Sequence, residues 1–302
     1  MQNPWESVPV AAFFRCPGCG GAEIEVLPAS WQCLGCGHIY PVEQEIPILH
    51  CAWPAHQQKI ARAQAANPGW YEELQPAEAV SPWRHHLKKR RLYVESAISG
   101  HLQARGQTRA AALLDLGCGD GNHLRYLQKY ARMSYGSDYN LARLARARRR
   151  CPEVPLYLAD ILNYPVQDDF FDIIFCNHVV EHIPEDHLAL QTMHRILKPG
   201  GLLVLGVPNE GAWWWQLAYR LQPGTLRTTD HVQFYTAAGI GRKLEDQEFK
   251  LLETVHLGWG PPHWGLDQAL RQFKVLDDFF EICGKRLVPQ QASSLYLLAT
   301  KG

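Results

Sequence analysis

The 302-residue sequence has no net charge, no long apolar run and no internal repeat. Thirty basic side chains balance thirty acidic ones, so a surface that binds a polyanion would have to be local. No apolar stretch approaches the length of a membrane span. The first residues, MQNPWESVPVAAFF, lack the basic segment and long apolar segment of a signal peptide. We therefore expect a cytoplasmic protein without a transmembrane segment.

The composition is that of a folded protein rich in cysteine. Hydrophobic residues make up 46% and charged residues 20%, which allows a sizeable core. The length suits a small module joined to a larger domain. The nine cysteines, without an export signal, are typical of a reducing compartment, where cysteines bind metal or are buried.

Four of these cysteines form two C-x-x-C pairs near the N-terminus. Cys16 and Cys19 are separated from Cys33 and Cys36 by 13 residues that read as strand, turn and strand. Each pair can bring two thiolates to one ion, and the glycine after each pair permits a tight turn. We expect a β-ribbon with a structural Zn²⁺, because four thiolates leave no open position for a substrate. Loss of this zinc is expected to leave a distant cofactor site largely intact.

A third Gly-Cys-Gly, at Gly117, Cys118 and Gly119, has no partner pair. It follows an apolar run that contains Asp115 and precedes Gly121 and a helical segment. Strand, glycine-rich turn and helix build a loop in which a nucleotide contacts backbone and a helix N-terminus.

Four further strand patterns alternate with helical segments after this loop. The second strand ends at Asp138, the third at Asp160, and the fourth, FDIIFCN, precedes HVVEH, where we expect a helix. The fifth follows LKPGG. Such alternation predicts a parallel sheet that binds its ligand at the carboxyl ends of the strands. A single long helix is expected over residues 266–287.

Together these motifs, over about residues 110–210, resemble the class I S-adenosylmethionine-dependent methyltransferases, with the ubiquinone-pathway enzymes as the subgroup. A dehydrogenase shares the strand–glycine–acid pattern but has no place for KPGG and NHVVEH. The resemblance implies an α/β fold: a Rossmann-like, seven-stranded, mostly parallel sheet with helices on both faces. It also implies the cofactor residues, which are Asp115, Gly117, Cys118, Gly119 and Gly121 at the methionine and ribose, Asp138 and Tyr139 at the ribose, Asp160 and Ile161 at the adenine, and Asn177 through its backbone.

The N-terminal module resembles the Trm112-type zinc ribbon, a small partner of methyltransferases that is here part of the same chain. This resemblance implies one further strand over residues 40–49, YPVEQEIPIL, packed on the ribbon. We expect the ribbon at residues 1–52 and a linker with a leading helix at 53–98. The methyltransferase domain is expected at 99–302, with lid insertions near 209–242 and 258–290.

The acceptor side of the reaction is less defined by sequence. On a helix, His178, Glu181 and His182 would share one face. They can supply a general base or, because HVVEH is similar to the acid-x-x-Glu-His pattern of ubiquinone-pathway O-methyltransferases, a second divalent-metal site. They can equally form a structural hydrogen-bond cluster. His178 stands where that pattern has a carboxylate.

Other segments leave further alternatives open. His231 and Tyr235 are second catalytic candidates, or only lid residues. Trp213, Trp214 and Trp215 can cover an apolar acceptor, contact a membrane surface peripherally, or pack within the lid. The basic runs at 84–91 and 143–150 are either solvated helix faces or, if they share one face, an RNA-binding surface.

We expect methyl transfer from S-adenosylmethionine to an oxygen of a small molecule, lipid or saccharide. The alternatives are methylation of RNA or protein, aided by the ribbon, and a non-catalytic scaffold. The oligomeric state stays open.

Overall fold

The computed structural model describes residues 4–66, 74, 76–221, 231–261 and 263–302. Within the predicted insertions and linker, residues 222–230, 262, 67–73 and 75 lie outside the described residues. The chain divides into two compact units. Unit 1 comprises residues 1–75, 109–175 and 195–201, and unit 2 comprises 76–108, 176–194 and 202–302.

Unit 1 begins with the four-stranded antiparallel sheet of the ribbon. Its strands are β1 (Ile24–Leu27), β2 (Ser30–Cys33), β3 (Ile39–Glu43) and β4 (Ile46–Pro47), in that order. Trp31 and Tyr40 are cross-strand partners and both are buried, so they form the small core of the sheet. Helix α1 (Val10–Phe13) precedes the ribbon and α2 (Trp53–Ala66) follows it.

The single strand expected over residues 40–49 is wrong. β3 and β4 form a hairpin whose two turn residues, Gln44 and Glu45, have φ of 52° and 63°. Two consecutive positive φ values are typical of a type I′ turn, which normally takes asparagine or glycine. Gln-Glu gives no such turn signal, so the sequence reads as one continuous strand.

The chain leaving this hairpin joins the second sheet of unit 1. Ile48 forms a parallel bridge with Leu158 of β7, and the Leu49 N–H donates to the Leu158 carbonyl at 2.9 Å. Ile46 and Ile48 are buried in the same hydrophobic cluster as Cys118. The ribbon therefore shares its core with the glycine-rich loop.

A seven-stranded sheet, ordered β10-β11-β9-β8-β5-β6-β7, confirms the predicted fold class. β6 lies parallel to both β5 and β7, whereas β11 is antiparallel to both of its neighbours. β5, with the sequence AAALLDL, is almost entirely buried, as expected for an interior parallel strand. The strands are β5 (Ala110–Leu116), β6 (Ala131–Asp138), β7 (Leu156–Leu158), β8 (Phe171–Asn177), β9 (Leu197–Pro208), β10 (Phe249–Leu257) and β11 (Ser294–Lys301).

Both faces of the strands in unit 1 are covered. A side chain at Gly136 would collide with Leu124, so the helix α5 packs closely against that face. On the other face the ring of Phe13 stacks on Tyr135 at 5.3 Å. The helices of this unit after the ribbon are α5 (Leu124–Leu127), continued by a 3-10 turn, and α6 (Leu141–Arg150), whose first turn is capped by the Asn140 side chain.

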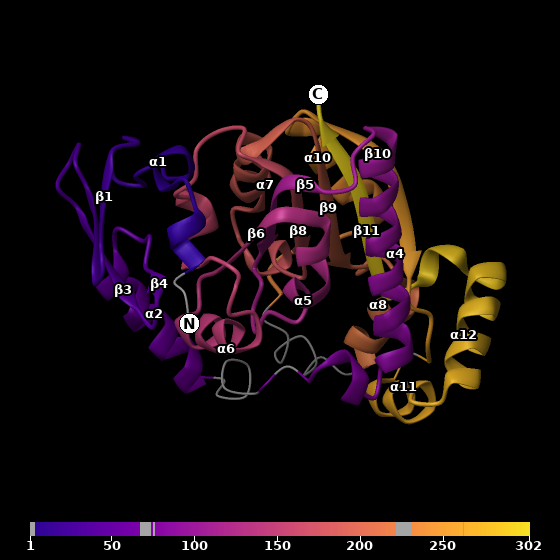
Figure 1. The fold of residues 1–302 in the computed structure, drawn as a ribbon. Helices are drawn as coiled ribbons and strands as arrows, with labels where there is room; N and C mark the ends of the chain where they lie inside the picture. The colour runs from indigo at the N-terminus through magenta and orange to yellow at the C-terminus, as the bar shows by residue number, and fades with distance from the viewer. Residues whose placement is uncertain (1–3, 67–73, 75, 222–230, 262) are drawn as a thin grey trace. The chain divides into compact units, whose positions relative to one another are not determined.

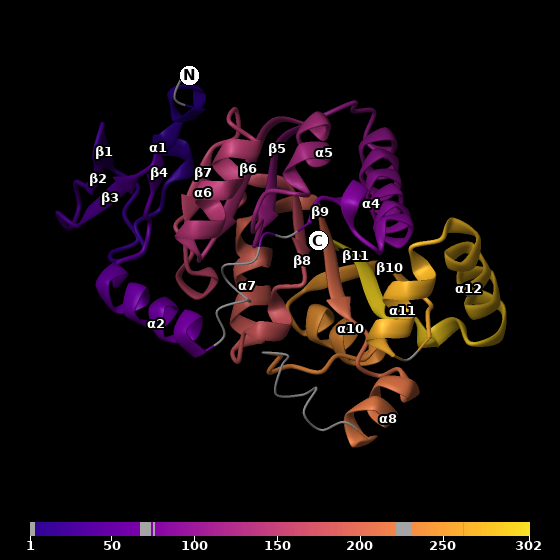
Figure 2. The same cartoon turned by 90° about the horizontal axis from the view of Figure 1, so that it is seen from below.

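In unit 2, α4 and α10 lie on opposite faces of β10 and β11 (Figures 1 and 2). Tyr93 of α4 packs against Tyr296 of β11 at 5.9 Å. No helix in the described part of the chain is long and apolar enough to cross a membrane. The helices are α4 (Arg84–Ala104), α7 (Asp186–Ile196), whose last two residues belong to unit 1, α8 (Trp213–Leu221), α10 (Ala237–Asp246), α11 (Trp264–Arg271) and α12 (Lys274–Leu287).

The single helix expected over residues 266–287 is also wrong, because α11 and α12 are separate. Phe273 between them has an extended backbone (φ −94°, ψ 120°). The carbonyl of Gln272 accepts from Arg84 at 2.7 Å and so is bound by α4. Lys89 of α4 also forms ion pairs with Asp277 at 2.6 Å and with two further acids of α12. These contacts with α4 come from far along the chain.

Candidate functional site

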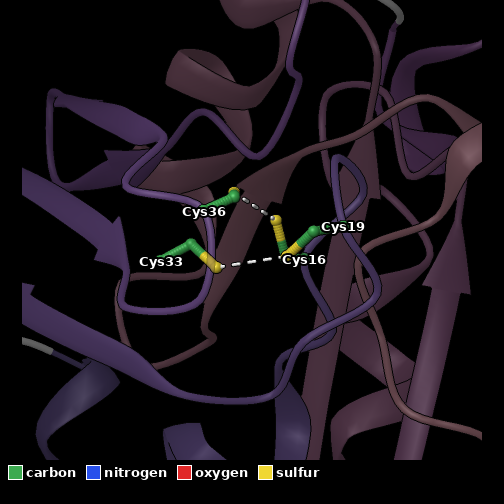
Figure 3. A group of neighbouring side chains, drawn as sticks. All are labelled: Cys16, Cys19, Cys33 and Cys36. Atoms are coloured by element: carbon green, nitrogen blue, oxygen red, sulfur yellow. Dashed lines mark hydrogen bonds between the residues drawn. The ribbon is translucent and has the colours of Figure 1, made fainter.

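Four thiols converge in the ribbon, as the sequence predicts. Cys16 and Cys36 have their sulfurs 3.7 Å apart, and Cys19 and Cys33 have theirs 3.6 Å apart (Figure 3). A tetrahedral Zn²⁺ with bonds of about 2.3 Å separates its sulfur ligands by about 3.8 Å. All four sulfurs lie within 4.8 Å of one another, so this cluster fits a structural zinc ion.

A fifth cysteine near this cluster was not singled out from the sequence. The Tyr40 hydroxyl lies 3.0 Å from Cys16 Sγ and 3.4 Å from Cys51 Sγ. Cys51 comes 15 residues after Cys36 and outside a C-x-x-C pair, so its position depends on the hairpin that sequence did not show.

The second strand of the sheet holds the glycine-rich loop through Asp138. Its Oδ2 accepts from the Gly119 N–H and its Oδ1 from the Asn140 N–H, both at 2.9 Å. Gly117 and Gly121 have φ of 76° and 78°, which side chains other than glycine rarely adopt. Burial raises the pKa of Asp138 despite these hydrogen bonds. The loop and this carboxylate therefore form one unit.

Asp115, at the end of β5, is 1% exposed, and its Oδ2 has no hydrogen-bond partner among the described residues. Burial, together with the negative charge of Asp138, raises its pKa well above the usual value. The side chain of Cys118 is buried in the hydrophobic core. Only its backbone is therefore placed to contact a ligand in the glycine-rich loop.

Two of the predicted cofactor residues, Asp160 and Tyr139, contact histidines from the end of the ribbon and from α2. Asp160 caps the 3-10 turn that starts at Ile161, and its Oδ2 lies 3.8 Å from His50 Nε2. His56 Nε2 lies 2.8 Å from the Tyr139 carbonyl oxygen. These pairings, His50 with Asp160 and His56 with Tyr139, were missed because residues so far apart in sequence carry no local signal.

In unit 2, the segment after β8 is not the expected helix. His178 has φ of 55°, a left-handed conformation held by its N–H donating to the Gly206 carbonyl at 2.9 Å. Only Val180–His182 form a 3-10 turn, and α7 begins at Asp186. The shared face predicted from helical spacing is therefore wrong, although the side chains still meet.

His178 and Glu181 form a close pair. His178 Nδ1 lies 3.0 Å from Glu181 Oε1, and Glu181 is 0% exposed. Burial alone would raise the pKa of Glu181, but the hydrogen bond and charge of His178 outweigh it and lower that pKa. The carboxylate thus orients the imidazole through Nδ1.

The backbone of Glu181 also holds the segment before α10, because its carbonyl accepts from Val232 at 2.8 Å and Gln233 at 3.0 Å. This brings the His231 ring to 5.0 Å from the His182 ring. Ligand atoms of Glu181, His182 and His231 all lie within 4.8 Å of one another.

Tyr235, a second catalytic candidate, is buried and bonded to the protein. Its hydroxyl donates to Asp186 at 2.7 Å, and burial with this hydrogen bond raises its pKa. A hydroxyl so engaged ties the segment before α10 to Asp186 of α7 and is poorly suited to accept a proton.

Glu210, just after β9, was missed by the sequence reasoning. It is 3% exposed, its Oε1 lies 3.1 Å from His231 Nδ1, and its Oε2 accepts from the Tyr219 hydroxyl at 2.5 Å. An acid next to the end of a strand was a signal that could have found it.

Several buried polar atoms near the end of β8 have no partner among the described residues. They are Asn177 Oδ1, His178 Nε2 and Glu181 Oε2. Buried polar groups normally pair, so such a group of unpaired atoms indicates a ligand or ion.

The tryptophans and basic runs are less informative. Trp213 is 59% exposed, and Trp215 stacks on Tyr219; the side chain of Trp214 lies outside the described residues. In the basic runs, Arg146 pairs with Asp120, and other arginines have acidic partners as well. Several of the basic side chains thus form ion pairs within the protein.

Known proteins resemble the part of the chain that follows the ribbon. Residues 114–205 match a family described as methyltransferase domain. Over 103 residues the chain is 33% identical to trans-aconitate 2-methyltransferase of Variovorax paradoxus, covering 33% of this chain and 40% of that protein. It is 25% identical to the ubiquinone biosynthesis O-methyltransferase of Alkalilimnicola ehrlichii, over 74% of this chain and 87% of that one.

A solved structure shares the fold. Magnesium protoporphyrin IX methyltransferase of Synechocystis, with bound S-adenosylhomocysteine, matches 81% of this chain and all of its own, with a TM-score of 0.54 and 17% identity. The chain spans about half the length or less of the first curated relatives it matches. Over residues 114–205 the chain therefore matches a methyltransferase domain, and the ubiquinone biosynthesis O-methyltransferase is a distant relative.

Proposed function

We propose that the chain, which contains this methyltransferase domain, transfers a methyl group from S-adenosylmethionine to an oxygen of a small hydroxyl-bearing molecule. The observation that carries the proposal is the set of unpaired buried polar atoms at strand ends: Asp115 Oδ2 in unit 1, and Asn177 Oδ1, His178 Nε2 and Glu181 Oε2 in unit 2. Such atoms are costly unless a ligand pairs with them.

Residues of unit 1 suit the cofactor. The glycines of the loop Gly117–Gly121 place no side chain between the backbone and a ligand, and the Gly119 N–H donates to Asp138. A carboxylate in this position can accept from both ribose hydroxyls. When bound, S-adenosylmethionine supplies an activated methyl group on a sulfonium.

His178 is the proposed general base. With Nδ1–H donated to Glu181, its Nε2 is left as an acceptor. In the reaction the acceptor O–H bond breaks and its proton passes to His178 Nε2. The oxygen forms a bond to the methyl carbon, and the sulfur keeps the electron pair of the broken S–C bond.

The names of two similar proteins support a small molecule as the methyl acceptor. One is named for trans-aconitate, and another for an O-methylation in ubiquinone biosynthesis. A carboxylate acceptor needs no base, whereas a hydroxyl does, so the two classes can be separated with one variant.

The test is transfer of labelled methyl groups to a panel of phenols, alcohols and carboxylic acids. With a hydroxyl acceptor, His178→Gln should lower turnover by about 10²–10⁴-fold while cofactor affinity is kept, the usual size of a general-base effect. His187→Ala, an exposed histidine on α7, is the matched control. Transfer only to carboxylic acids, unaffected by His178→Gln, would contradict both the base and the acceptor class.

A further inference from the structure

Three side chains of unit 2 come together from two distant segments. Glu181 and His182 lie in the 3-10 turn after β8, and His231 lies in the segment before α10. One ligand atom from each lies within 4.8 Å of the other two. The hydrogen bonds from Val232 and Gln233 to the Glu181 carbonyl fix the two segments against each other.

Glu181 and His231 are each held by a side chain behind them. His231 Nδ1 is held by Glu210, itself held by the Tyr219 hydroxyl, so His231 Nε2 is the nitrogen left to bind. Glu181 Oε1 is held by His178, while Glu181 Oε2 is fully buried and has no partner in the described part of the chain. A carboxylate behind a ligating histidine is the usual outer support of a metal site.

We infer that Glu181, His182 and His231 bind one divalent cation of the Zn²⁺ class, in addition to the ion of the four cysteines. A cation pairs the otherwise orphaned Glu181 Oε2, which a purely structural cluster leaves unsatisfied. Two imidazoles and one carboxylate suit Zn²⁺ and leave its fourth position open. The sequence-based expectation named His178 as the third ligand. In the structure the third ligand is His231, and His178 instead forms a hydrogen bond with Glu181.

The open fourth coordination position of the ion would take an oxygen ligand. A hydroxyl or phenol oxygen bound to the ion loses its proton more readily, as metal-bound water does. This extension rests on the proposed function, whereas binding of the ion does not.

The test counts metal ions on the full chain after removal of bound metal with a chelator and titration with Co²⁺. Wild type should bind two ions per chain. The cysteine site is recognised by thiolate-to-cobalt charge-transfer absorption, and the second ion should add only d–d bands. His231→Ala should bind one ion with the thiolate absorption unchanged, and His187→Ala should still bind two.

Conservative variants keep the test valid if His231→Ala folds poorly. His182→Gln should likewise bind one ion. Glu210→Gln should retain both ions at saturation but bind the second about 10- to 100-fold more weakly, the usual effect of losing an outer carboxylate. One ion in wild type, or two in both His231→Ala and His182→Gln, overturns the inference.

S-adenosylhomocysteine binding, measured on the same samples, reports separately on the proposed function. Its expected ligands lie in unit 1 except for Asn177, and none of them is a proposed metal ligand. A protein that binds two ions but no S-adenosylhomocysteine would therefore refute the function and leave the metal centre standing.

Discussion

Asp138 combines two tasks in one carboxylate, because it holds the glycine-rich loop and is the expected ribose acceptor. Hydrogen bonds to a charged group contribute about 1.5–3 kcal/mol each, and about 1.4 kcal/mol corresponds to tenfold in affinity. Asp138→Ala should therefore weaken S-adenosylmethionine binding at least tenfold, measured by calorimetry. Glu153→Ala, an exposed acid of the same unit, is the control. An unchanged dissociation constant would show that the cofactor does not use this strand end.

The raised pKa of Asp115 predicts that the stability of the protein depends on pH. Its pKa in the folded protein is raised above the usual 3.8 by burial and by Asp138. A raised folded pKa means that its contribution to stability is complete below about pH 3.8 and is lost as pH rises through the folded value. Asp115→Asn does not titrate, so without cofactor it should be the more stable protein at neutral pH.

The measurement is urea unfolding of both proteins across pH. The stability advantage of Asp115→Asn should shrink as the pH is lowered from neutral, while S-adenosylmethionine binding by this variant should be weaker than in wild type. An advantage that is constant with pH would mean that Asp115 titrates normally.

Only some residues of the candidate site could be predicted from the sequence. The acids at strand ends were recognisable because an apolar run followed by Asp is a local pattern. Glu210 and His231, or His50 and Asp160, pair across 21 and 110 residues, and only the fold brings them together.

Among the elements, the long apolar strands and the leading helix α4 were predictable, the helix only from a loose apolar pattern, whereas turns held by tertiary hydrogen bonds were not. The positive φ of His178 depends on Gly206, and the break before α12 coincides with a bond from Arg84 to Gln272. Gln44 and Glu45 adopt a turn that their side chains do not favour.

The ribbon hairpin changes one expectation about zinc. Ile48 and Leu49 pair with Leu158 of β7, and Ile46 packs in the same hydrophobic cluster as Cys118 of the glycine-rich loop. We therefore predict that Cys33→Ser not only releases zinc but also lowers the stability of unit 1 and weakens S-adenosylhomocysteine binding. Calorimetry with metal analysis checks this, with Cys283→Ser in α12 as the control. Zinc loss with full cofactor affinity would show the ribbon to be independent.

At the scale of the whole molecule, basic side chains form ion pairs with nearby acidic ones. Arg148 pairs with Glu45 of the ribbon turn, and Lys89 with Asp277 of α12, so parts of both basic runs serve to join elements. This pairing weakens the case for RNA as the acceptor, since a phosphate-binding surface needs cations that are not already neutralised.

β11 lies between β9 and β10 although it is the last strand in the sequence. During synthesis the chain emerges from its N-terminus, and units fold as their parts become available. The ribbon can bind its zinc early, but β9 and β10 leave the ribosome without the strand that separates them. Unit 2 can therefore complete its part of the sheet only after translation of residues 294–301, and until then the edges of β9 and β10 that pair with β11 have no strand beside them.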